Sequence, residues 1–445
     1  MNKTPSQLKT PNDQQSSYWG AAFIALICGS IIILFSLGIR HGFGLFLKPV
    51  SAEMQWGVQV FAFAIALQNL VWGIAQPFTG LLSDKYGSPI IVTTGAILYS
   101  AGLWVMADIT TVTSYVIQIA SVVGFNADQL NANFDEIAQT CFILGAGIFI
   151  GLGLSGTTFP VIFGTISRLV KPEQRSLAMG VAMSVGSFGQ FIMLPISLSL
   201  LTWLDWHGAL IALSLMALIM FPLAFGLKEP NLNNTDPKVL SVSPYEAIKE
   251  ALSMRDFWLL SLGFFACGFQ VVFISVHLPL YLSDRNLDAS VATTVLALIG
   301  LINIIGTYYA GLWGGRQRKP MLLSWLYLLR GLVIAAFILL PISTYTAYAF
   351  GLLMGLFWLS TVPLTNGTVA SVWGVKHMSM LGGVVFFWHQ LGSFIGGWLG
   401  GWVYDKTGNY DIVWYLAIGF SLLSALLNWP ITETPVAQRE KRVSI

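Results

Sequence analysis

Residues 80–89 read GLLSDKYGSP, and residues 311–320 read a degraded copy of the same segment, GLWGGRQRKP. A second matching pair, the triplet GSF, begins at Gly186 and again at Gly392. Each copy follows an equivalent apolar stretch, so we expect the chain to be built from two similar halves. The copies are 231 residues apart for the first pair and 206 for the second, which places about 25 additional residues in the first half.

The composition indicates a membrane protein. Hydrophobic residues make up 55% of the 445 residues and charged residues only 9%, whereas soluble domains carry about 25% charged residues. Apolar runs of about 20 residues, long enough to cross a bilayer as a helix, recur along the chain. We predict an all-α membrane protein with twelve transmembrane helices in two six-helix halves. The spans are placed at residues 19–46, 58–79, 90–107, 138–167, 176–201, 208–227, 257–281, 291–313, 321–341, 344–372, 379–402 and 411–431.

The distribution of basic residues predicts the orientation of these spans. If the N-terminus is cytoplasmic, the segments on the cytoplasmic side hold 17 of the 22 Lys and Arg residues. The outer loops hold only Lys48, Arg285 and Lys406, and Arg40 and Arg330 lie within spans. Cytoplasmic loops are enriched in Lys and Arg. We therefore expect a multi-pass protein of the plasma (inner) membrane with both termini in the cytoplasm.

Segments outside the spans define the expected domain organisation. Residues 1–227 form the first half, and residues 257–445 form the second. Residues 228–256 form a cytoplasmic linker, whose opening, EPNLNNTDPK, is rich in turn-forming residues. The additional residues of the first half are assigned to an outward insertion at about 108–136, which holds four acidic residues and no Lys or Arg. This insertion is either a tolerated loop or an interfacial helix.

The loop after the second span carries a spaced motif. The pattern Gly-x-x-x-Asp-x-x-Gly is formed by Gly80, Asp84 and Gly87, with Lys85 beside the acid. A twelve-span chain divided six plus six with this loop resembles the major facilitator superfamily of secondary transporters. The resemblance implies that the loop latches the two halves together in one access state, with Arg316 in the second copy belonging to the same gating motif. A glycine replaces the acid in that copy, so we expect an asymmetric latch carried by Asp84 and Lys85; otherwise the loop only ends two helices.

Three further segments resemble one branch of that superfamily, the monocarboxylate and oxalate/formate porters. They are GIRHGFGLFLKP in the first span, the loop SRLVKPEQRSLAMG, and GGWVYDKTGNYD at the end of the eleventh span. The resemblance implies a cavity lined by the first and eleventh spans, each with a basic residue, and transport coupled to a proton. The Arg that branch members often carry in the eighth span is absent from this sequence.

The charges within the spans indicate the kind of substrate. All 20 Asp and Glu residues lie in loops, at span ends or in the tails, so Arg40 and Arg330 have no acidic partner at membrane depth. An Arg at the centre of a transmembrane helix costs about 2.5–3.5 kcal/mol, and the carboxylate of a substrate would complete the ion pair. We therefore predict that Arg40 binds an organic anion, although its side chain could instead reach the outer headgroups. Arg330 is better explained as a structural anchor, and His41 as a packing or interfacial residue.

Polar residues in the cavity-lining spans complete the predicted site. His389 and Gln390 lie near the middle of the eleventh span, and His389 is the candidate for proton coupling because imidazole titrates near neutral pH. Gln270, Asn303 and Asn366 lie in the seventh, eighth and tenth spans. Each of these groups could bind the substrate, but a buried histidine or a hydrogen bond between helices would explain them equally well.

These observations predict a secondary transporter that moves a small organic anion, most readily a monocarboxylate, by alternating access. The resemblance implies that the anion moves in symport with a proton. An efflux transporter for amphipathic compounds is the alternative, and a receptor without transport is a further one. A membrane-embedded enzyme is not expected, because the sequence shows no nucleophile with a base, no metal cluster and no phosphate loop. The expected partners are the anion, a proton and the bilayer, with no cofactor, metal or nucleic acid, and the chain is expected to act as a monomer.

Overall fold

The structure is a computed structural model that describes residues 11–56, 58–229, 243–436 and 438, and all regular elements in these residues are helices. The first half contains α1 (Pro11–His41), η1 (Gly42–Phe46), α2 (Leu47–Met54), α3 (Val58–Tyr86), α4 (Ser88–Ala107), α5 (Ile109–Val122), α6 (Ala127–Ala132), α7 (Phe134–Ile143), η2 (Leu144–Phe149), α8 (Ile150–Thr157), α9 (Phe159–Leu169), η3 (Pro172–Gln174), α10 (Arg175–Leu218), α11 (Met220–Ala224) and η4 (Phe225–Leu227). After α12 (Pro244–Ser253), the second half contains α13 (Arg255–Ser283), α14 (Ala289–Gly314), α15 (Lys319–Leu339), α16 (Thr344–Phe357), α17 (Thr361–Trp373), α18 (Met378–Thr407) and α19 (Asp411–Asn428).

The long apolar helices form the twelve predicted crossings. Eleven stretches are long and apolar enough to span a membrane, and one of them, Pro172–Leu227, has 56 residues. A helix of that length would measure about 84 Å at 1.5 Å per residue, more than twice the ~30 Å hydrocarbon thickness. Asp205 interrupts α10 with φ 59° and ψ −173°, so this stretch crosses twice. The twelve crossings in the described residues confirm the predicted all-α membrane fold.

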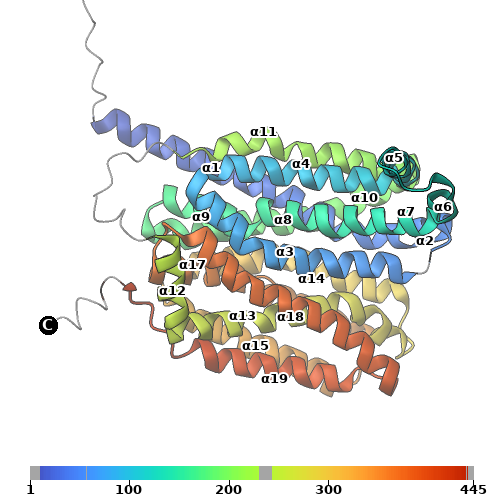
Figure 1. The fold of residues 1–445 in the computed structure, drawn as a ribbon. Coiled ribbons are helices and arrows are strands. Elements are labelled where there is room, and N and C mark those ends of the chain that lie inside the picture. Colours follow the sequence, from blue (N-terminus) through green and yellow to red (C-terminus); the bar gives the residue numbers. More distant parts are fainter. Residues whose placement is uncertain (1–10, 57, 230–242, 437, 439–445) are drawn as a thin grey trace, which may run out of the picture.

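The crossings form two packed groups. Figure 1 shows the helices of the first half as one layer and those of the second half as another, with the axes of the long helices in both layers roughly aligned. The layers contact each other mainly through α3 against α18 and α10 against α14. Glycines allow these close approaches, since a Cβ on Gly180 would lie 2.6 Å from Gly311 Cα. The halves are therefore joined by helix pairs whose backbones nearly touch.

The fourth and tenth crossings each contain a break. In the fourth crossing, Thr158 has extended backbone (φ −120°, ψ −165°) and separates α8 from α9. In the tenth, residues 358–360 separate α16 from α17. Irregular backbone at membrane depth is tolerated where other protein groups satisfy its polar atoms. Arg330 does so in the tenth crossing by donating to the carbonyl oxygens of Phe357 and Trp358, which agrees with the structural role predicted for it.

The insertion of the first half is largely helical. Figure 1 shows α5 end-on at one end of the bundle, across the direction of the long helices, with α6 beside it. Ile109 and Ile117 are buried on one face of α5, whereas Tyr115, Ile119 and Val122 are exposed on another. An exposed apolar face on a helix that lies across the bundle end is typical of an interfacial helix.

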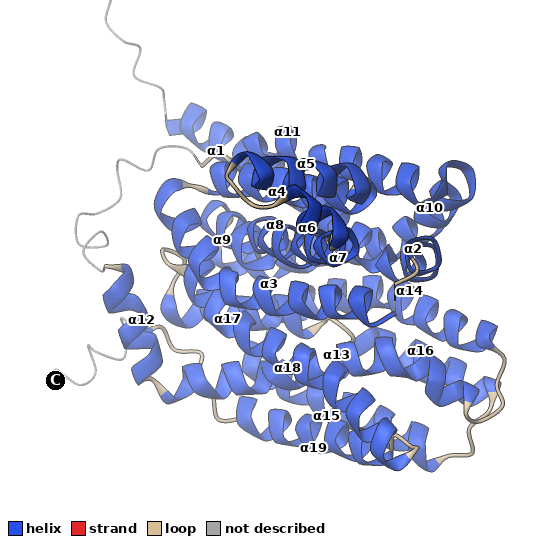
Figure 2. Ribbon diagram, turned by 45° about the vertical axis from the view of Figure 1, so that its right-hand side comes forward, coloured by secondary structure: helices blue, strands red, loops and turns tan. Residues whose placement is uncertain are grey.

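The linker contains one described helix at the opposite end of the bundle. Helix α12 begins with a capping box between Ser243 and Glu246, and hydrogen bonds from the Ser243 backbone N–H and hydroxyl hold the pKa of the exposed Glu246 carboxyl below its usual value. Figure 2 shows α12 at one end of the bundle. Of the turn-rich opening predicted at residues 229–238, only Glu229 lies within the described residues.

Candidate functional site

Arg40 lies in the last turn of α1 and contacts α3. Its Nη2 atom donates to Asn69 Oδ1 at 2.5 Å, and its guanidinium carbon lies 5.2 Å from the centre of the Trp72 ring. Its Nε atom is buried and has no hydrogen-bond partner among the described residues. Arg40 takes part in none of the ion pairs that the described residues form. The Arg40 guanidinium therefore lies between an amide and an aromatic ring, and its Nε–H group donates no hydrogen bond.

Helix α3 positions both neighbours of Arg40. Asn69 and Trp72 are three residues apart and so share one face of the helix. Asn69 Nδ2 donates to a main-chain oxygen one turn earlier at 2.9 Å, which leaves Oδ1 to accept from Arg40. The Trp72 indole N–H lies 2.9 Å from Gln76 Oε1 and 3.1 Å from Thr158 Oγ1. These bonds hold the ring against the break in the fourth crossing.

His389 and Gln390 approach the same place from α18 in the second half. Gln390 Nε2 donates to the main-chain oxygen of Asn69 at 3.3 Å, and Gln390 Oε1 lies 3.1 Å from His389 Nδ1. If the neutral imidazole carries its proton on Nδ1, that atom donates to Gln390 and Nε2 is an acceptor. Nε2 is buried and has no hydrogen-bond partner in the described part of the chain. Polar contacts therefore link Arg40 to His389 through Asn69 and Gln390, across the contact between the halves.

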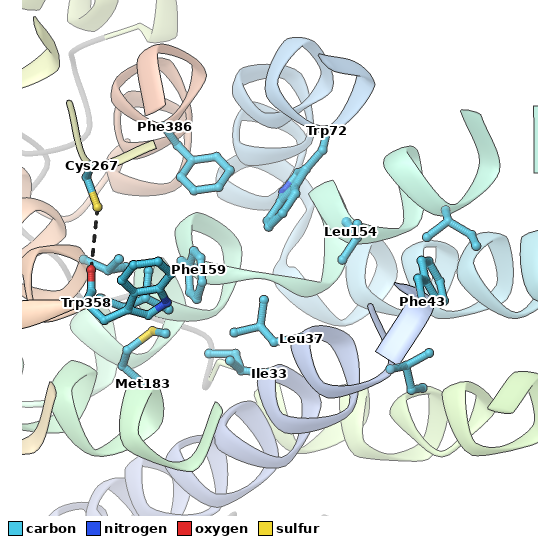
Figure 3. Packing of buried hydrophobic residues seen from close by; sticks show 14 of the residues in the cluster. Ile33, Leu37, Phe43, Trp72, Leu154, Phe159, Met183, Cys267, Trp358 and Phe386 are labelled. Atoms are coloured by element: carbon cyan, nitrogen blue, oxygen red, sulfur yellow. Dashed lines mark hydrogen bonds between the residues drawn. The ribbon is translucent and has the colours of Figure 1, made fainter. Parts of the chain in front are cut away.

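Aromatic side chains from both halves surround these polar groups. The ring centres of Trp72 in α3 and Phe386 in α18 are 5.0 Å apart, and Phe159 at the start of α9 lies 5.8 Å from Phe386. Figure 3 shows these three rings gathered in one region of the buried core. His389 stacks on Phe386 with ring centres 5.2 Å apart and an angle of 10° between the planes. A ligand on Arg40 would have an apolar surface next to it.

Gln270 is occupied by hydrogen bonds within the second half. Its Nε2 atom donates to Ala417 O at 2.7 Å and to Ser421 Oγ at 2.6 Å, and its Oε1 atom accepts from Arg330 Nη1 at 3.1 Å. Gln270 and Arg330 are both fully buried. These bonds join α13, α15 and α19 and involve neither of the two candidate basic groups, Arg40 and His389, so they favour a structural use of Gln270.

The two asparagines predicted to bind the substrate differ in whether a side-chain atom is left without a hydrogen bond. Asn303 Nδ2 donates to Ser187 Oγ of α10 at 2.9 Å, and its Oδ1 accepts from the Leu359 backbone N–H at 3.0 Å. Asn303 is therefore used in the contact between the halves. Asn366 donates to Val362 O at 3.0 Å, and its Oδ1 is buried without a partner among the described residues. An unused acceptor is poorly suited to an ionised carboxylate, which offers no donor.

The loop motif lies against the start of α18 in the other half. Asp84 Oδ1 accepts from the Ser379 backbone N–H at 3.3 Å, and Oδ2 accepts from that of Met380 at 2.9 Å. The first N–H groups of a helix have no partner within the helix. Asp84 therefore caps a helix of the opposite half, with its negative charge at the positive end of the helix dipole. Gly80 is required for this approach, because a Cβ there would collide with Ser379 O.

Arg168 completes this group. Its Nη1 atom binds Asp84 Oδ1 at 2.7 Å, and its Nη2 atom binds Glu229 Oε1 at 2.8 Å. Lys85, predicted to share the latch, is exposed instead, with its Nζ atom 4.9 Å from the centre of the Tyr86 ring. The cation beside Asp84 is therefore Arg168. We call Asp84, Arg168 and the capped first turn of α18 the latch, and the end of the bundle that carries them the latch end.

The second copy of the loop packs without a carboxylate. Gly311 lies against Gly180 of α10, and a Cβ on Gly314 would also collide with α10. Arg316 is exposed and forms no ion pair within the described residues, so it takes no part in the latch here. Gly87, which closes the first copy, has φ 91°, a value that favours glycine. The contacts of the two copies are thus asymmetric.

Several contacts of this arrangement were not predicted from the sequence. Asn69 and Trp72 share a face of the second span with Gln76, and this grouping is a usable signal. No local pattern indicates that Phe386 lies opposite Trp72, because that contact depends on how the halves pack. The same reason explains why Arg168 was not recognised as the partner of Asp84.

Comparisons with known proteins point to one family. A family model described as the Major Facilitator Superfamily matches residues 18–397. The chain is 25% identical over 419 residues to an uncharacterised MFS-type transporter, YcxA, of Bacillus subtilis (strain 168), covering 88% of this chain and 92% of that protein. It is 26% identical over 428 residues to monocarboxylate transporter 11 of Homo sapiens, covering 93% and 83%. Among solved structures, the transporter FucP in an outward conformation has a TM-score of 0.67 at 15% identity, with 92% of this chain and 100% of that chain covered.

Proposed function

Because the chain belongs to the major facilitator superfamily, whose members are transporters and not enzymes, we propose that it carries a small organic anion and that Arg40 binds the anion. One observation carries this proposal: Arg40 lies beside Asn69 and Trp72 with a buried, unpartnered Nε atom and no acidic partner among the described residues. A substrate carboxylate would supply the missing half of the ion pair. A monocarboxylate is the simplest substrate with this property.

The charge balance around Arg40 supports an anionic substrate. Taking an ion out of water costs several kcal/mol even after the protein relaxes, and the neutral oxygen of Asn69 offsets only part of that cost. A guanidinium group presents N–H groups in one plane that match both oxygens of a carboxylate. The unused Nε atom leaves this two-pronged contact available. That a relative of similar sequence is named a monocarboxylate transporter also supports the proposal.

His389 is the group through which we expect a proton to accompany the anion. Its Nδ1 atom contacts Gln390, and its Nε2 atom is unpartnered and can accept a proton. The contacts through Asn69 and Gln390 connect it to Arg40. A bound anion favours a charged imidazole nearby, and a charged imidazole in turn strengthens binding of the anion. This reciprocity is the physical basis of symport.

The latch corresponds to one of two access states. While Asp84 caps α18, the halves are held together at the latch end, so the anion would reach Arg40 from the opposite end. We place the latch end in the cytoplasm, because the segments assigned to that side hold 17 of the 22 Lys and Arg residues. Release of Asp84 would let the halves rock along the α3–α18 and α10–α14 contacts and expose the site to the cytoplasm.

Uptake by the purified protein in proteoliposomes tests this function. A panel of labelled mono- and dicarboxylates is offered with and without an inward proton gradient. Arg40→Ala should abolish uptake, and Arg40→Lys should leave only weak uptake because Lys is a point charge without the planar fork. Lys406→Ala removes an exposed cation far from the site and serves as the control. Undiminished uptake by Arg40→Ala would remove Arg40 from the mechanism.

A second candidate function is efflux of amphipathic compounds. The rings of Trp72, Phe159 and Phe386 favour it, because they place apolar surface next to Arg40. A deletion strain separates the two functions. Loss of growth on single carboxylic acids supports anion uptake, whereas lost resistance to amphipathic compounds with normal growth on those acids supports efflux.

A further inference from the structure

An apolar groove lies on the side of the second half that would face the lipid, between α14 and α15, and it includes none of the candidate site residues. It encloses about 330 Å³, and its lining includes Tyr309, Trp313, Trp325, Leu329 and Phe357. This volume falls within the range of pockets that bind small molecules. Trp313, Trp325 and Leu329 are partly exposed at the surface of the bundle. In a membrane the groove therefore opens toward lipid hydrocarbon.

The groove is somewhat shorter than the thickness of one bilayer leaflet. It is lined from Gly306 to Trp313 on α14 and from Leu322 to Leu329 on α15, which corresponds to about 10 Å along each helix at 1.5 Å per residue. Its lining also includes Phe357, the last residue of α16, next to the break in the tenth crossing. One leaflet of hydrocarbon is roughly 15 Å thick. Part of an acyl chain of the leaflet at the latch end therefore fits this length and the apolar lining.

Tryptophans line the groove, and basic residues follow Trp313 in the chain. Trp313 and Trp325 lie near its latch end, and Trp is enriched at the level of the lipid headgroups. Arg316 follows within one turn, since its backbone N–H donates to Trp313 O at 2.9 Å. The adjacent Arg318 and Lys319 bind Ile431 O and Glu433 of the chain after α19. Arg316 has no such partner among the described residues and is exposed, so its charge is available within one turn of the groove residue Trp313.

We propose that the groove binds one acyl chain of an anionic phospholipid whose phosphate lies on Arg316. The apolar lining holds the chain, and the exposed guanidinium selects an anionic headgroup over a zwitterionic one. The chain would contact Phe357, whose carbonyl oxygen accepts from the buried Arg330. The lipid thus supports the break in the tenth crossing. The sequence places Arg316 in the gating motif. In the proposed lipid site Arg316 instead binds a phosphate, and this function does not depend on the anion at Arg40.

Thermal unfolding and native mass spectrometry of the purified full-length protein test the proposal. The delipidated protein in detergent is titrated with dioleoylphosphatidylglycerol, with dioleoylphosphatidylcholine and with inorganic phosphate. Phosphatidylglycerol should raise the unfolding temperature saturably and remain bound as a single molecule, phosphatidylcholine should do so more weakly, and phosphate should have no effect. An equal effect of phosphatidylcholine would overturn the role of Arg316, and an equal effect of phosphate alone would overturn the lipid assignment.

Variants separate the headgroup contact from the chain contact. Arg316→Gln should abolish the preference for phosphatidylglycerol over phosphatidylcholine. Ala310→Phe should fill the groove and remove the retained lipid from the mass spectrum; Leu329→Trp fills it from the opposite wall if Ala310→Phe does not fold. Lys406→Gln removes one exposed charge far from the groove and should bind both lipids like the unmodified chain. Retention of phosphatidylglycerol by Arg316→Gln and by a folded filling variant, at the level of the unmodified chain, would refute the site.

Discussion

Replacing Asp84 by Asn should loosen the latch end. Asparagine keeps the size of the side chain and one acceptor oxygen, but it removes the charge that lies against the first N–H groups of α18 and beside Arg168. A negative charge at a partly buried helix N-terminus contributes up to about 2 kcal/mol. Because Asn also accepts a capping hydrogen bond, we expect the closed state to lose about 1–2 kcal/mol relative to the open one. That loss corresponds to roughly a 5- to 30-fold shift in the ratio of the two states.

A cysteine introduced at a position that the latch buries would measure the population of the open state. Ser379 is fully buried in the described structure, and its side chain lies where a Cβ on Gly164 of α9 would collide with it. In a background without Cys28, Cys141 and Cys267, a Ser379→Cys variant should react with a maleimide only when the halves separate at this end. Adding Asp84→Asn should raise the alkylation rate by the same factor of about 5 to 30.

Glu229→Gln is the matched control for this experiment. It removes a carboxylate partner of Arg168 but leaves Asp84 and its bonds to α18 in place. Its effect on the alkylation rate should be clearly smaller than that of Asp84→Asn. An unchanged rate in Asp84→Asn, with Ser379→Cys still reactive in the denatured protein, would show that Asp84 does not hold the halves together.

Four other substitutions test the remaining assignments. Gly80→Ala should raise the same alkylation rate, because the added methyl group collides with the Ser379 carbonyl. Arg330→Met should lower the unfolding temperature, because it leaves two carbonyl oxygens of the tenth crossing without their donor, at about 1–3 kcal/mol for each buried group left unsatisfied. Gln270→Leu should also lower that temperature but leave substrate affinity in a binding assay unchanged. His389→Gln should retain exchange of anion for anion across proteoliposomes but lose uphill uptake driven by a pH gradient.

The fold was predictable because its signals are local. Apolar runs of membrane length and the loop repeated at Gly80 and Gly311 require no knowledge of packing. The breaks at Thr158 and at residues 358–360 were not predicted. Their backbone groups are satisfied by side chains of other crossings, such as Arg330, and sequence position does not reveal those partners.

The candidate site was predictable where a residue is chemically unusual at membrane depth. Arg40 and His389 stand out in an apolar chain, and contacts through intervening amides connect them. Gln270 and Asn303 look equivalent to Gln390 in the sequence, yet their amides donate to Ala417, Ser421 and Ser187, whereas Gln390 contacts Asn69 and His389. Which amides line a site and which join helices depends on helix rotation, which a single polar residue does not define.

The claim that Arg40 binds a substrate carboxylate is tested most directly by comparing an acid with its amide. A thermal-shift screen of the purified protein against carboxylates identifies a ligand, and its primary amide then has nearly the same shape but no charge. Hydrogen bonds to charged groups contribute about 1.5–3 kcal/mol, so the unmodified protein should bind the acid at least about tenfold more tightly than the amide. In Arg40→Gln this preference should disappear. An Arg40→Gln protein that still prefers the acid by the same factor would contradict the account.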